Sequence, residues 1–67
     1  MNKLALLLAN YDLNNFYTVS IWQHSIDLQG NADNKTIEYC KNLGFEFNYE
    51  GKFLKAKKEQ INITLTF

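Results

Sequence analysis

Residues 45–56, FEFNYEGKFLKA, decide the fold that this sequence predicts. Apolar and polar side chains alternate on both sides of Glu50–Gly51, which is typical of two strands joined by a tight turn. A two-residue loop pairs Tyr49 with Lys52, Phe47 with Leu54 and Phe45 with Ala56, and a four-residue loop keeps the same faces. In either case the inner face carries Phe45, Phe47, Leu54 and Ala56. In the two-residue register Glu46 lies opposite Lys55 on the outer face.

The neighbouring segments extend this hairpin into a sheet with a helix. Downstream, KKEQ (57–60) predicts the next turn, and the last strand alternates, with Ile61, Ile63, Leu65 and Phe67 facing inward. Upstream, we expect a helix over residues 34–43, with Asp33 or Asn34 as N-cap and Gly44 just beyond its end. Its broad apolar side holds Thr36, Ile37, Tyr39, Cys40 and Leu43.

The N-terminal part predicts a helix over residues 3–13 and one long strand over residues 16–29. The apolar positions of this strand change side, from Tyr17, Val19 and Ile21 to Trp22, Ile26 and Leu28. Either a β-bulge near Gln23 or a first half buried on both faces explains the change. The predicted fold is α+β: an N-terminal helix, then β-α-β-β-β, with a four-stranded, mainly antiparallel sheet and helix 34–43 on one face.

Length and composition restrict the class of protein. The 67 residues allow a single domain, 1–67, and a chain this short is marginally stable as a monomer, so we expect a homodimer. The net charge is zero, and all seven basic residues are lysines. The single cysteine excludes an internal disulfide and favours a reducing compartment. The apolar run 4–9 is far shorter than the roughly 20 residues of a membrane span, and we expect a cytoplasmic protein without membrane partners.

Few residues could carry catalysis. In an unbroken strand His24 shares a face with Trp22 and Ile26, while Asp27 points to the other face. We interpret His24 as a structural or surface histidine; a partner contact and a chemical role are the alternatives. Cys40 lies on the apolar side of its helix as a small hydrophobic residue. With no phosphate loop, triad or metal-ligand cluster, we expect no enzyme, no cofactor and no metal site.

Two surfaces could bind partners. In KFLKAKK (52–58), Phe53, Lys55 and Lys57 project from the outer face, as in sheets that stack bases and neutralise phosphate. The alternative is a solvated strand whose lysines discourage edge aggregation. The second surface comprises Phe53, the apolar set 17, 19 and 21, and the back of helix 3–13. Either that helix folds over the outer face, or an exposed patch serves self-association or a target protein.

The C-terminal half also carries a resemblance. The terminal strands of residues 43–67, LGFEF…GKFLKAKK…INITLTF, occur here with lysine- and asparagine-rich, arginine-free usage. In this the chain resembles the small uncharacterised proteins that bacteriophages and other mobile elements encode. The resemblance implies binding of a host or phage macromolecule, including inhibition of bacterial defence.

The sequence therefore predicts a small non-enzymatic protein–protein interaction module that acts by occluding an unknown protein target. Its predicted partner-binding residues are Tyr17, Ile21, Trp22, Phe53, Lys55 and Lys57. One alternative is a nucleic-acid-binding sheet that uses Phe53, Lys52, Lys55, Lys57 and Lys58. The other alternative is a structural subunit of a larger assembly.

Overall fold

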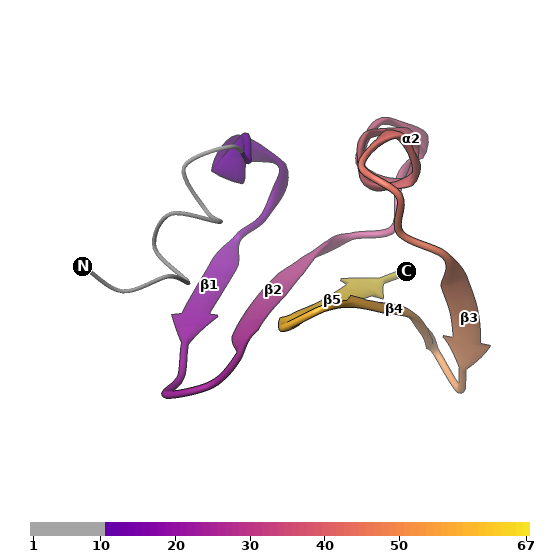
Figure 1. Cartoon of the computed structure of the whole chain (residues 1–67). Coiled ribbons are helices and arrows are strands. Elements are labelled where there is room, and N and C mark those ends of the chain that lie inside the picture. The colour runs from indigo at the N-terminus through magenta and orange to yellow at the C-terminus, as the bar shows by residue number, and fades with distance from the viewer. Residues whose placement is uncertain (1–10) are drawn as a thin grey trace.

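Over residues 11–67 the protein has an α+β fold in which one α-helix covers one face of a five-stranded mixed sheet (Figure 1). The computed structural model describes residues 11–67. Its elements are the 3-10 turn η1 (Leu13–Asn15), β1 (Thr18–Ile21), β2 (Ile26–Asn31), α2 (Asn34–Asn42), β3 (Phe47–Glu50), β4 (Phe53–Lys58) and β5 (Ile61–Thr66). The strand order is β1-β2-β5-β4-β3, and β2 and β5 are parallel while the other neighbours are antiparallel. The expected α+β class and the helix on one face of the sheet are confirmed. The prediction of a four-stranded sheet is wrong, because the sheet has a fifth strand.

The fifth strand arises because the predicted strand 16–29 is a hairpin. Ile21 lies opposite Ile26, and the Trp22 backbone N–H donates to the Ser25 carbonyl at 2.8 Å. The chain therefore reverses over Gln23–His24, and this reversal is what moves the apolar positions from odd to even. The expected β-bulge near Gln23 and the two-sided burial are both wrong. The two loop residues, Gln23 and His24, are not among the residues that usually form turns, so the loop itself gives no turn signal in the sequence.

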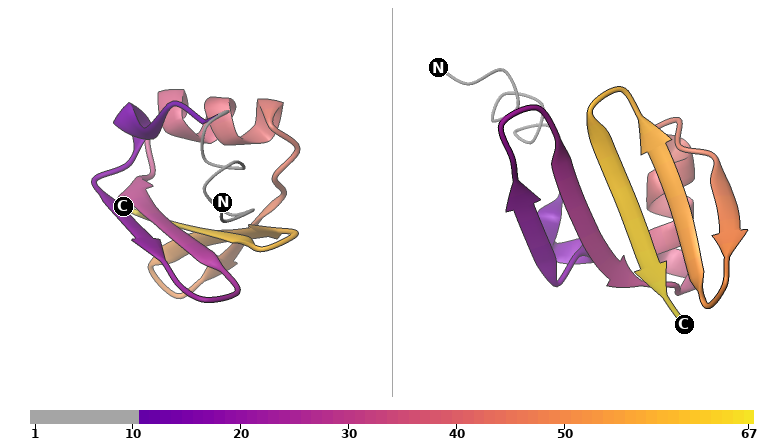
Figure 2. Two further views of the ribbon diagram at one scale, coloured as in Figure 1. Left: turned by 60° about the vertical axis from the view of Figure 1, so that its left-hand side comes forward. Right: turned by 90° about the horizontal axis from the view of Figure 1, so that it is seen from below.

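The predicted helix 3–13 lies mostly outside the described residues. In its last part, residues 11–13, the structure shows a cap and the start of η1 instead, with the Asp12 carboxylate accepting from the Asn14 N–H at 3.1 Å. The Asp12 N–H donates to the Tyr39 hydroxyl at 2.6 Å. The Tyr11 and Phe45 rings pack edge to face, with their centroids 6.4 Å apart. These contacts place residues 11–15 on the same side of the sheet as α2 (Figure 2).

Helix α2 has the start and the end that its sequence predicts. The Asp33 carboxylate accepts from the Thr36 N–H at 2.8 Å, and this hydrogen bond holds the pKa of the Asp33 carboxyl below its usual value. Gly44 follows the helix with φ +97°, a conformation that costs glycine little. The Lys58 ammonium donates to the Leu43 carbonyl at 2.6 Å, so a cation caps the negative end of the helix.

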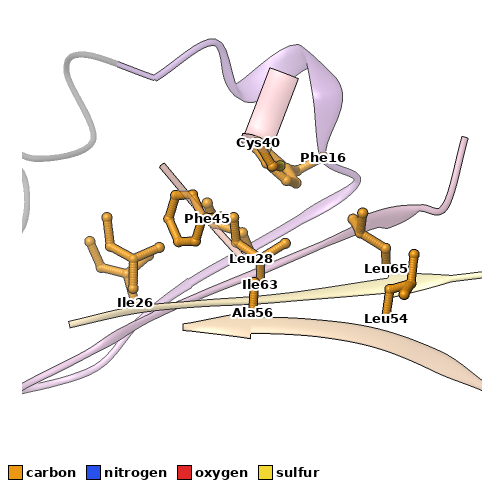
Figure 3. Packing of buried hydrophobic residues seen from close by; sticks show 10 residues of the cluster. Phe16, Ile26, Leu28, Cys40, Phe45, Leu54, Ala56, Ile63 and Leu65 are labelled. Carbon is orange, nitrogen blue, oxygen red and sulfur yellow. The ribbon is translucent and has the colours of Figure 1, made fainter. Parts of the chain in front are cut away.

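The core lies between α2 and the inner face of the sheet, the face turned towards the helix (Figure 3). Its buried apolar residues are Phe16, Ile26, Leu28, Cys40, Phe45, Leu54, Ala56, Ile61, Ile63 and Leu65. The inward alternation predicted for residues 61–65 is thus confirmed. Phe67 is an exception, because it lies past the end of the core, is 72% exposed and stacks on Tyr49.

The β3–β4 hairpin keeps its predicted faces but not its predicted register. Phe47 pairs with Ala56 and Glu50 with Phe53, so the loop is Gly51–Lys52 and the pairing is shifted by two residues. Gly51 adopts φ +63° at the first loop position, which glycine tolerates better than the other residues. A shift of two leaves every side chain on its face, and its main effect is that Asn48 replaces Glu46 opposite Lys55.

The packing at Gly30 gives a test of this arrangement. A Cβ at Gly30 would lie 2.9 Å from the Asn15 backbone oxygen and 3.3 Å from the Phe16 ring. Gly30→Ala should therefore lower the free energy of unfolding by about 1–3 kcal/mol, measured by urea denaturation. Gln29→Ala, at the neighbouring exposed position of the same strand, is the control and should change it by less than about 0.5 kcal/mol. Equal stability of Gly30→Ala and the unmodified protein would contradict the close approach of Asn15.

Candidate binding surface

The outer face of the sheet, turned away from α2, is the candidate site. Seen from below in Figure 2, it presents all five strands with the helix behind them, and no element of residues 11–67 lies in front of it. The strand register arranges its side chains in three rows. They are Ser20–Asp27–Asn62–Lys57, Thr18–Gln29–Thr64–Lys55–Asn48 and Asn31–Thr66–Phe53–Glu50. The face is thus polar along its central strands β2 and β5.

A shallow hollow of about 600 Å³ lies over this face. Its charged lining comes from four positions on three strands and from the residue before β3: Asp27, Glu50, Lys55, Lys57 and Glu46. The amides of Gln29, Asn48 and Asn62 and the Thr64 hydroxyl supply hydrogen-bonding groups of both kinds. Three carboxylates against two ammonium groups leave the hollow with mixed charge and a small negative excess.

Asp27 connects the hollow to the only tryptophan of the chain. Its carboxylate accepts from the Trp22 indole N–H at 2.7 Å and from the Asn62 side-chain amide at 3.1 Å. Both carboxylate oxygens are therefore engaged, each by a different strand or turn. The Trp22 side chain stays 58% exposed while its polar end is held. The indole is thus a fixed apolar surface at the margin of a polar face.

Tyr17 is held in a similar way at the other end of β1. Its backbone N–H donates to the Gln29 carbonyl at 2.9 Å, although the register partner of Gln29 is Thr18. Tyr17 and Thr18 thus both lie opposite Gln29, as in a β-bulge, and the Tyr17 side chain points to the outer face together with that of Thr18. The Thr66 hydroxyl donates to the Gly30 carbonyl at 3.3 Å, which uses its only proton. The Tyr17 hydroxyl therefore donates to Thr66 Oγ1, at 2.7 Å.

Phe53 is the third aromatic residue of the outer face. It lies opposite Thr66 and Glu50, and the Lys55 ammonium is 5.9 Å from its ring centroid. A cation at this distance is attracted to the ring face. Phe53 remains partly exposed, so the ring and the lysine form one joint surface beside the hollow.

Most of the predicted site residues share the outer face: Tyr17, Trp22, Phe53, Lys55 and Lys57. Ile21 lies on the other face, opposite buried Ile26, because the hairpin reversal inverts the parity of β1. Of the two further lysines, Lys52 is in the β3–β4 loop, and Lys58 is bound to Leu43 on the inner side. Prediction missed Asp27 and Asn62. Their mutual contact depends on the parallel pairing of β2 with β5, and the contact of Asp27 with Trp22 depends on the reversal at Gln23–His24.

The residues considered for catalysis lie apart from one another. His24 is exposed in the β1–β2 turn, whereas Cys40 is fully buried in the core. Burial raises the pKa of the Cys40 thiol to about 11, so the thiol is protonated at neutral pH. Among residues 11–67 there is no group of three or more His, Cys, Asp or Glu that could hold a metal ion. Over the same residues, no helix is long and apolar enough to cross a membrane.

The carboxylate of Asp27 should fix the orientation of Trp22. Asp27→Ala removes the acceptor of the indole hydrogen bond and of the Asn62 amide. We expect the fluorescence anisotropy of Trp22 to fall and the free energy of unfolding to drop by about 1 kcal/mol. Glu50→Ala removes a carboxylate from the same face without touching Trp22, so its anisotropy should equal that of the unmodified protein. Unchanged anisotropy in Asp27→Ala would show that another contact holds the indole.

Comparisons of the chain with family models, with curated proteins and with solved structures find no match. The function is therefore inferred from the residues and geometry of this chain.

Proposed function

We propose that this protein is a small non-enzymatic interaction module that binds and occludes a host or phage protein through the outer face of its sheet. The observation that carries the proposal is the pair of tethered, exposed aromatic residues on this face, Tyr17 and Trp22. The resemblance of the chain to small phage and mobile-element proteins supports an origin in such an element and a role that depends on binding alone.

Tethered aromatic side chains favour a binding role for a thermodynamic reason. A flexible side chain loses conformational entropy when a partner immobilises it, whereas Tyr17 and Trp22 are already held by hydrogen bonds. Both keep a large exposed ring surface for contact. Aromatic residues of this kind supply much of the binding energy at protein interfaces.

The charges around these rings favour a protein over a nucleic acid as the partner. A nucleic-acid platform needs a positive surface, since its affinity comes largely from phosphate neutralisation. Here Lys55 and Lys57 share the hollow with Asp27, Glu46 and Glu50. Lys58, a member of the predicted basic set, is bound to the helix end on the opposite face. The mixed pattern complements a protein surface that carries both charges.

The proposal is tested by comparing variants of two exposed aromatic positions in affinity capture from a panel of bacterial lysates. Trp22→Ala changes the outer face, whereas Tyr49→Ala removes an exposed ring on the inner side and serves as the matched control. We expect Tyr49→Ala to capture the same protein as the unmodified chain in a similar amount. Trp22→Ala should recover at least tenfold less of that protein. Equal retention by both variants would contradict use of the outer face.

A parallel titration with a random single-stranded oligonucleotide examines the competing function. We expect no binding at low salt. Binding that weakens steeply with salt, and that Lys55→Glu and Lys57→Glu abolish, would replace the protein-binding proposal by a nucleic-acid-binding one.

A further inference from the structure

The edge of β1 that faces away from β2 has backbone groups that no strand of the described residues uses. Within residues 11–67, β1 is bonded only to β2. The bonded pair Trp22–Ser25 fixes the alternation along this ladder, so Ser20 and Thr18 also bond towards β2. The N–H and C=O groups of Val19 and Ile21 therefore point away from the sheet. Their side chains lie on the inner side, 37% and 51% exposed.

The two edges of the sheet differ in the chemistry that protects an edge from pairing. From residue 13 to residue 26 the sequence contains neither a carboxylate, a lysine nor a proline, the residues that usually blunt an edge strand. The opposite edge, β3, ends in Glu50 and follows directly after Glu46. Antiparallel pairing of β3 with a second β3 would bring these carboxylates together. The β1 edge has no such charge against self-pairing.

We propose that β1 pairs antiparallel with β1 of a second copy of this chain, with Ser20 opposite Ser20 of the second copy on the two-fold axis. In this register Val19 of each copy is bonded to Ile21 of the other, which gives four backbone hydrogen bonds. A register centred on Val19 would need the Tyr17 N–H, which already donates to Gln29. A register centred on Ile21 would pair Val19 with Gln23 of the turn. The Ser20 register alone uses both outward residues of each copy.

Side-chain contacts on the inner side support the same register. Val19 of each copy lies beside Ile21 of the other, which gives two such contacts related by the two-fold axis. The pairing therefore covers apolar surface that is exposed in the single chain. The expected homodimer is thereby given a specific interface. One four-residue strand per copy is small for a protein interface, so we expect dissociation in the micromolar range.

The dimer would also combine the two outer faces. Trp22 comes opposite Thr18 of the second copy, next to the second Tyr17, so that the tethered aromatic residues of both copies gather at the centre of a ten-stranded sheet. The use of this joined surface by a partner rests on the proposed function. The pairing itself does not, and it is tested without any partner.

Sedimentation of the full chain between about 1 and 200 µM is the first test. We expect a concentration-dependent dimer. Ile21→Lys should remain folded but raise the dissociation constant of the dimer at least 100-fold, because it places a lysine in each of the two Val19–Ile21 pairs of the interface. Tyr49→Lys changes a more exposed inner-side residue far from β1 and should dimerise normally. A monomer throughout this range, or a dimer that Ile21→Lys leaves intact, would overturn the proposal.

Disulfide formation tests the register. In the proposed pairing the two Ser20 positions form a non-bonded antiparallel pair with Cα atoms about 4.5 Å apart, within disulfide range. The two Thr18 positions are separated by roughly 13 Å along the strands. Ser20→Cys should therefore form a covalent dimer under mild oxidation, while the half-buried control Thr18→Cys should not. Native Cys40 is buried in both variants and does not interfere. Failure of Ser20→Cys to cross-link, or equal cross-linking of Thr18→Cys, would overturn the assignment.

Discussion

The parallel pairing of β2 with β5 is the constraint on which the rest of the structure depends. Ile26 lies opposite Ile61 and Leu28 opposite Ile63, and all four side chains are at most 2% exposed. Two parallel neighbours cannot be joined by a tight turn, so the chain must cross over between them. Here the crossover contains α2, which covers the strands that it connects. β1 and β4 then add to the two sides of this pair as antiparallel hairpin partners.

The character of the outer face follows from the same pairing. Because side chains alternate along a strand, burial of one set in β2 and β5 directs the intervening set outward: Asp27, Gln29, Asn62 and Thr64. An apolar layer over this centre would leave these groups without hydrogen-bond partners, at a cost in free energy. The aromatic residues are therefore found towards the margins of the face, where Asp27 and Thr66 hold Trp22 and Tyr17.

Local patterns predicted much of this molecule, and their failures have identifiable causes. The caps and apolar side of α2, the inward set of β5 and the outward positions of Phe53, Lys55 and Lys57 follow from periodicity and capping chemistry. The β1–β2 hairpin was missed because Gln23–His24 has no turn residue. That one omission accounts for the missing strand and for the wrong face of Ile21. The shifted β3–β4 register was missed because a slip of two residues leaves the polar pattern unchanged.

By itself the sequence determined which side of each strand or helix faces the core in residues 26–66, because alternation and helical period are local and apolar burial enforces them. Only the tertiary structure decided which strands are neighbours and hence which side chains meet. Asp27 with Asn62, and Tyr17 with Thr66, are separated by 35 and 49 positions. Their contacts depend on strand order and on the reversal at Gln23–His24, and the free energy that sets both is spread over the whole core rather than stored in any short segment.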